Sequence, residues 1–254
     1  MDPRRARFPK SLVGPGFIQH AQGMHVPLSA VPAAVPAELP APLPGGEAAL
    51  IGLAALVMVT VPFIWPLIEH VDAMAHEGMH ALLAAALGFS ILEFVLNRDG
   101  SGHVRHTAEA FGLRVLLVSL AGYLGPSAFG LGAARLIATG HVIAVLWLAI
   151  GALVLLLTTI STSFGLLSVP VAAALLVVVV RNAHTGLEEF VVYLLTWLML
   201  LSGVRTAVQH GARAGDARNL TASTHLPRHL WALIWIAGTL YALAVAGKWL
   251  VLGA

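Results

Sequence analysis

The chain has 254 residues, of which 58% are apolar and only 10% are charged. Soluble domains carry about a quarter charged residues, so this composition excludes an ordinary soluble protein and indicates a polytopic membrane protein. The chain has no cysteine and a formal net charge of only +2, which excludes disulfides, thiolate metal ligands and nucleic-acid binding.

Residues 1–46 form a proline-rich tail, with stretches such as VPAAVPAELPAPLPGG. Proline fixes φ and removes a backbone donor, so such a segment favours an extended linker, with partner docking as the alternative. The basic start, MDPRRARFPK, is not followed by the apolar core of a secretory signal peptide. The sequence therefore predicts a disordered cytoplasmic tail over 1–46 and one membrane-embedded domain over 47–254.

Seven apolar runs follow, and several approach the ~20 residues that a helix needs to cross a bilayer core. We expect an all-α helical bundle of about six to seven transmembrane segments in the plasma membrane. All Lys and Arg residues except Arg135, Arg181 and Lys248 then fall on one face, which the positive-inside rule makes cytoplasmic. This layout has the N-terminus inside and the C-terminus outside. The expected spans are 47–66, 70–89, 111–137, 141–160, 166–180, 186–204 and 229–251.

The segment ILEFVLNRDGSGHVRHT separates the second and third runs. Residues 91–96 favour a β-strand, Asp99-Gly100 favours a tight turn, and Val104 to Thr107 can return as a second strand. The sequence predicts a short β-hairpin here, on the cytoplasmic face.

The second run contains HEGMH, from His76 to His80. Residues i and i+4 share one helix face, so both histidines can bind one metal ion, while Glu77 beside them can take a proton from water. The alternative is a pair of histidines bonded to each other or to backbone carbonyls. Three ionisable residues within one turn of an apolar span are too costly to explain by packing alone, and the pattern predicts a zinc site with Glu77 as general base.

A catalytic zinc site needs a third protein ligand, and several acidic residues can be weighed for it. Asp72 shares the histidine face but lies about 12 Å from His80 along the helix, so it can only support a ligand. Asp99 is explained by its turn. Glu188 and Glu189 are expected at the opposite face of the membrane, at a solvated helix start.

Asp216 remains, in the polar stretch HGARAGDARNLTASTHLP before the last span. It could reach the histidines from the cytoplasmic side, or it could act only as a helix N-cap. His225 and His210 are weaker alternatives in the same stretch. The third ligand therefore stays open at this point, with Asp216 favoured.

Four stretches in this order resemble the site-2 protease family of intramembrane zinc metallopeptidases, in its compact bacterial branch without a PDZ domain. They are AHEGMHALLAAALG, RDGSGHVRH, LAGYLGPSAFGLGAA and DARNLTASTHLPRHLWALIW. The resemblance implies a zinc ion held by His76, His80 and Asp216, with Glu77 as general base, close to the cytoplasmic side. The distal aspartate of the family usually stands in an Asn-Pro-Asp-Gly or Leu-Asp-Gly setting, whereas here it stands in GDARN.

The resemblance also implies a transmembrane protein substrate within the lipid bilayer. A helical peptide bond is shielded by its own hydrogen bonds, so the substrate must be unwound. The edge of the predicted hairpin could hold the unwound chain by strand addition at Phe94 and Val104. In the third span, Gly122, Gly125 and Pro126 could lie beside the active site and contact substrate, or could only allow close helix packing.

A metal-ion transporter that uses His76, Glu77 and His80 as its transport site is the alternative function. Transporters line their path with polar groups from several spans. Here the fourth, fifth and seventh runs carry almost no carboxylate or histidine, which favours the protease. A catalytically inactive scaffold is disfavoured because all three residues of the motif are present.

Overall fold

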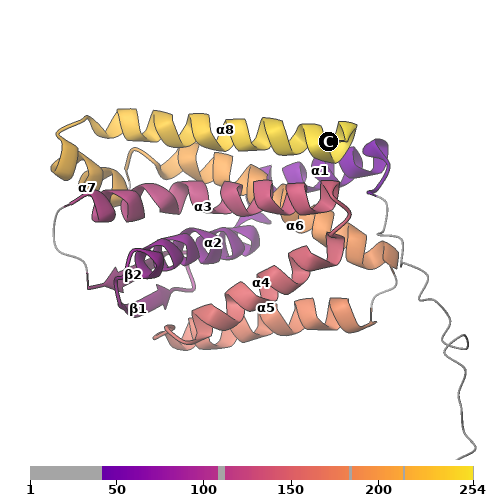
Figure 1. Cartoon of the computed structure of the whole chain (residues 1–254), viewed down its shortest axis with the longest axis horizontal. Coiled ribbons are helices and arrows are strands. Elements are labelled where there is room, and N and C mark those ends of the chain that lie inside the picture. Colours follow the sequence, from indigo (N-terminus) through magenta and orange to yellow (C-terminus); the bar gives the residue numbers. More distant parts are fainter. Residues whose placement is uncertain (1–41, 108–111, 183–184, 214, 254) are drawn as a thin grey trace, which may run out of the picture. The chain divides into compact units, whose positions relative to one another are not determined.

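The computed structural model describes residues 42–107, 112–182, 185–213 and 215–253 (Figure 1). The predicted tail over 1–46 therefore lies almost wholly outside the described residues. The elements in chain order are α1 (Gly45–Thr60), α2 (Trp65–Ala86), β1 (Ile91–Leu96), β2 (Gly102–His106), α3 (Leu113–Ala138), α4 (Val142–Leu157), α5 (Ser163–Asn182), α6 (Thr185–His210), α7 (Gly215–Thr224) and α8 (Arg228–Leu252).

Helix α3 is the centre of the bundle and packs against α2, α6 and α8. The buried side chains form separate clusters along it, one around Tyr193 and Leu250 and another around Tyr123 and Trp235. Many outward side chains are also large and apolar, and Leu175 on α5 is 62% exposed. An apolar surface of this kind is solvated by lipid. The prediction of an all-α, multi-pass membrane protein is confirmed.

Four helices are long and apolar enough to cross a bilayer unaided, namely α3, α5, α6 and α8. Helices α1 and α2 meet at a 100° bend and can form a fifth, broken span. Pro62 lies in this break, since proline supplies no N–H to continue a helix. Pro66 instead occupies the first turn of α2, where that N–H is not needed. The shorter apolar helix α4 has 16 residues.

The start of α1 and the end of α8 lie at the same end of the bundle. Gly45 packs against the carbonyl oxygen of Val251, and the Leu43 N–H donates to the Tyr193 hydroxyl at 3.0 Å. The hairpin and α7 lie at the other end (Figure 1). The expected seven alternating crossings, which put residues 47 and 251 on opposite faces, are therefore wrong. With α1 and α2 as one bent crossing, the described residues hold up to five candidate crossings, beside the shorter apolar helix α4.

This arrangement also makes two expectations about membrane orientation incompatible with each other. A cytoplasmic hairpin and a cytoplasmic start of the first helix cannot both hold, because Gly45 and the hairpin lie at opposite ends of the bundle. The cause is the bend between α1 and α2, which keeps the two apolar runs from acting as two separate crossings.

The predicted hairpin is present, with β1 and β2 antiparallel and Phe94 opposite Val104. The loop between α4 and α5 adds a third segment on the far edge of β1. Phe94 donates its N–H to the Thr159 carbonyl and accepts from the Ser161 N–H, both at 3.0 Å. The hairpin is thereby fixed to the α4–α5 pair at this end of the bundle.

Two polar segments differ from expectation. The stretch around Asp216 is a short helix, α7, whose buried Leu220 packs into the cluster of Tyr123 and Trp235. Glu188, expected at a solvated helix start, is buried in the first turn of α6. In both segments the polar sequence predicts exposure to solvent, but tertiary packing buries part of the segment.

Candidate metal centre

The two histidines of the motif face α3 from one side of α2. Their Nε2 atoms are 3.2 Å apart, as the spacing of four residues predicts. The His80 Nδ1 atom lies 2.8 Å from the Val118 carbonyl oxygen on α3. Because a carbonyl oxygen only accepts, Nδ1 must carry the proton, and Nε2 of the neutral ring keeps its lone pair. His80 is therefore oriented as a metal ligand.

Asp216 reaches the same point from the first turn of α7. One of its carboxylate oxygens, Oδ2, lies 3.5 Å from the His76 Nε2 atom and 3.3 Å from the His80 Nε2 atom. The three ligand atoms all lie within 4.8 Å of one another. Helix α7 is held there by Leu220 and Ala217, which are buried against α3 and α8. The structure thus brings together the three residues that the resemblance implies.

Gly122 of α3 allows the close approach at this point. A Cβ atom on Gly122 would lie 2.7 Å from the His76 Nε2 atom and still closer to that of His80. Gly125, one turn on, lies against Met79 and the Ala75 carbonyl of α2. Helix packing accounts for Gly125 in this way, and it also accounts for Pro126, which is buried beside Gly203 of α6.

Glu77 is 8% exposed, and its side chain extends from α2 to the hairpin. A Cβ atom on Gly102, the first residue of β2, would be 2.9 Å from the Glu77 Cγ atom and 3.4 Å from its Oε1 atom. Only a glycine at this position lets the strand run directly past the carboxylate. Glu77 is therefore adjacent both to the three-residue cluster and to the backbone of β2.

Aromatic packing behind His76 was not predicted from the sequence. The Tyr123 ring meets the His76 ring edge-on, with centroids 4.6 Å apart, and stacks on Trp235 at 4.5 Å. The Trp235 Nε1–H donates to the Leu120 carbonyl at 2.9 Å, which fixes the indole. The sequence does show a tyrosine next to Gly122. It does not show that this tyrosine stacks on Trp235, because the two residues are far apart in the chain.

The remaining candidates lie elsewhere. Asp72 is buried, and it accepts hydrogen bonds from the hydroxyls of Ser202 at 2.6 Å and Thr206 at 2.7 Å, which tie α2 to α6. Asp99 accepts from the Ser101 hydroxyl at 2.6 Å and from the Ser101 N–H at 3.1 Å within the hairpin turn. These hydrogen bonds from Ser101 hold the pKa of Asp99 below its ordinary value.

His210 and His225 join no metal-binding group among the described residues. His210 is exposed at the end of α6, and His225 follows α7 with a φ of 60°. They stand at turns of the chain on either side of Asp216, which explains why the sequence pattern alone could not separate them from it.

The donor set of His76, His80 and Asp216 fits zinc. Zn²⁺ prefers imidazole nitrogen and carboxylate oxygen, and catalytic zinc sites use three such protein ligands. One histidine donates its other ring nitrogen to a backbone carbonyl, which is the usual support for a zinc ligand. Among the described residues, no fourth His, Asp or Glu joins this group.

Comparison with known proteins places this site in a family. The family model described as Peptidase M50B-like matches residues 49–246, a range that includes α2, the hairpin, α3, α7 and most of α8. No curated protein and no solved structure gave a significant match. The match covers most of the chain and confirms the predicted kinship with the site-2 proteases. The chain belongs to the Peptidase M50B-like family and is a membrane peptidase.

Proposed function

We propose that this protein is an intramembrane zinc metalloendopeptidase that hydrolyses peptide bonds in or near transmembrane segments of other membrane proteins. The observation that carries the proposal is the cluster of His76, His80 and Asp216 with Glu77 beside it. The cluster lies in an apolar bundle of a peptidase family, which supports a membrane-embedded catalyst that acts on membrane proteins.

The ion would be held by His76, His80 and Asp216, and when bound it supplies a Lewis acid and lowers the pKa of water. Glu77 takes the proton from the attacking water and delivers it to the leaving amine. Its position supports this role, since Glu77 directly follows the ligand His76 on α2 but is not one of the three residues of the cluster. The Val118 carbonyl keeps His80 in one tautomer throughout.

The edge of β2 that faces away from β1 is the best place for an unwound substrate. The Phe94 N–H and C=O form hydrogen bonds with Thr159 and Ser161 on the far side of β1. The pair Phe94–Val104 is therefore a non-hydrogen-bonded pair of the hairpin. The N–H and C=O of Val104 therefore point away from β1, as do those of Gly102 two residues earlier. A strand added to this edge would run past Glu77.

This geometry changes the expected set of substrate contacts. Phe94 has no free backbone group and its side chain is fully buried, so it supports the sheet and does not contact substrate. Gly122 adjoins the metal ligands, whereas Gly125 and Pro126 are accounted for by packing between helices. The proposed substrate contact is therefore the β2 edge at Gly102 and Val104.

We place the hairpin and α7 at the cytoplasmic face. The arginines of the described chain gather at that end of the bundle, as the positive-inside rule requires of cytoplasmic segments. They are Arg98, Arg105, Arg114, Arg205, Arg213, Arg218 and Arg228, whereas Arg135, Arg181 and Lys248 belong to the other end. With this orientation Gly45 begins α1 at the external face.

The test is cleavage of membrane-spanning peptides by the purified protein in liposomes, with cut positions mapped by mass spectrometry. We expect cuts in or next to the apolar segments with the wild type, and cleavage reduced by about 10²–10⁴-fold with Glu77→Gln. Zinc uptake into the liposomes without cleavage of any peptide would instead support the metal-ion transporter.

A further inference from the structure

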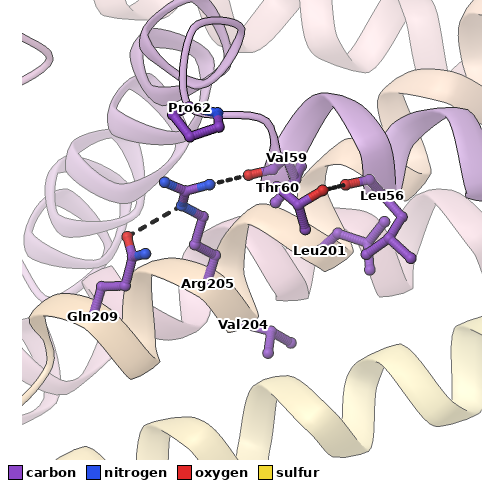
Figure 2. A pocket seen from close by; sticks show the side chains of 8 residues that line it. All are labelled: Leu56, Val59, Thr60, Pro62, Leu201, Val204, Arg205 and Gln209. Carbon is purple, nitrogen blue, oxygen red and sulfur yellow. Dashed lines mark hydrogen bonds between the residues drawn. The ribbon is translucent and has the colours of Figure 1, made fainter.

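A cavity of about 480 Å³ lies between the end of α1 and the second half of α6, and its lining includes no residue of the candidate metal centre (Figure 2). Leu56, Leu201 and Val204 contribute to its apolar walls. Its polar atoms come from Thr60, Arg205 and Gln209. The Thr60 hydroxyl is already used, because it donates to the Leu56 carbonyl at 2.7 Å. Arg205 is therefore the dominant polar feature of an otherwise apolar cavity.

The guanidinium of Arg205 is held rigidly but is not neutralised. It donates to the Val59 carbonyl oxygen and, through Nε, to the Gln209 Oε1 atom at 3.1 Å. Its other support is the Trp65 ring, whose centroid lies 4.0 Å from Cζ. All three partners are uncharged, and no carboxylate of the described residues forms an ion pair with Arg205.

The arrangement leaves donors for a ligand. A guanidinium has five N–H groups, and Val59 and Gln209 use two of them. The planar fork of an arginine matches the oxygens of a phosphate, and binding is stronger where the cation is already oriented. Because the Arg205 guanidinium has no anionic partner among the described residues and the cavity walls are apolar, the ligand that fits best is an anion with an apolar part.

The depth of Arg205 along α6 narrows the choice of ligand. It precedes His210, the last residue of α6, by five residues, which is about 7.5 Å of helix. In a helix that crosses the bilayer, this is the level of the lipid headgroups and the adjoining acyl carbons. The apolar walls can contact an acyl chain, while Arg205 can bind the negatively charged headgroup of the same lipid.

We propose that this cavity is a binding site for an anionic phospholipid, with its phosphate on Arg205 and an acyl chain between α1 and α6. Such a lipid would lie against the break that joins α1 to α2, the helix that carries His76 and His80. The proposal is independent of the proposed peptidase function, because lipid binding can be measured without catalysis.

The experiment is native mass spectrometry of the full chain purified in detergent, with added phosphatidylglycerol or phosphatidylcholine. Wild type is expected to retain one phosphatidylglycerol in preference to phosphatidylcholine. Arg205→Gln should lower this retention by about 10-fold or more, because charge-assisted hydrogen bonds to the phosphate are lost. Val204→Trp, which keeps Arg205 but fills the cavity, should lower it as well.

Arg135→Gln is the matched control, because Arg135 also lies over an indole, that of Trp249 at 5.6 Å, but does not line the cavity. It should retain phosphatidylglycerol as the wild type does. Wild-type retention in both Arg205→Gln and Val204→Trp would overturn the proposal and leave Arg205 as a cap for the end of α1. If Arg205→Gln fails to fold, Val204→Trp decides. Equal retention of the two lipids by the wild type would also overturn the proposal, because it removes recognition of the charge.

Discussion

Replacing Gly122 with alanine should weaken zinc binding without touching a ligand. The added methyl carbon would lie 2.7 Å from the His76 Nε2 atom and closer to that of His80, far inside van der Waals contact. Neither ring can turn away freely, since Tyr123 packs against His76 and Val118 holds His80. Helices α2 and α3 must move apart, or the rings must leave their positions.

Overpacking of this kind costs about 1–3 kcal/mol. If that cost is relieved when the metal is absent and the rings are free to shift, zinc affinity falls by about 5- to 150-fold, at tenfold per 1.4 kcal/mol. The assay is competition for zinc against a chromophoric chelator, with the protein purified in detergent.

Gly132→Ala is the control for this variant, because it adds the same methyl group to the same helix at a point with no atom within 4 Å. It should bind zinc as the wild type does. An unchanged zinc affinity in Gly122→Ala, with Gly132→Ala also unchanged, would refute the close packing of α3 on the histidines.

The remaining variants test separately the general base, the third metal ligand and the strand that would bind substrate. Gly102→Ala presses on Glu77 and on the Val95 carbonyl of β1 but on no residue of the cluster, so it should keep zinc and lose most cleavage, and loss of zinc would contradict this. Asp216→Ala should lose zinc affinity and activity, while Asp99→Ala should loosen a turn and keep the metal; the reverse pattern would exchange the assignment. Val104→Pro removes an edge donor and should impair cleavage at full zinc occupancy, and unchanged turnover would place the substrate elsewhere.

The local features of this protein follow from its sequence. A spacing of four residues is enough to set His76 and His80 on one helix face, and the pattern of 91–106 is enough to indicate a hairpin. These predictions succeed because they depend on backbone geometry within one or two elements. The apolar runs likewise indicate helices, since nothing else satisfies the backbone within lipid.

The features that depend on tertiary contacts could not be predicted in the same way. Nothing near Asp216 in the sequence shows that α7 folds back to the histidines, because the buried face of α7 is short and packs on distant Trp235. The expectation that the first two apolar runs are two separate crossings fails for a similar reason. Pro62 marks a break, but whether the chain there reverses or only bends depends on what packs around it, including Arg205 on the Val59 carbonyl.

The most direct test of the central claim is zinc content measured together with cleavage, in the wild type and in Glu77→Gln purified side by side. The account predicts one zinc per chain in both proteins, because Glu77 is not a ligand. It predicts cleavage of a membrane-spanning peptide by the wild type, reduced by about 10²–10⁴-fold in Glu77→Gln because the general base is missing. Cleavage by Glu77→Gln at the wild-type rate, or by wild-type protein stripped of zinc, would contradict it.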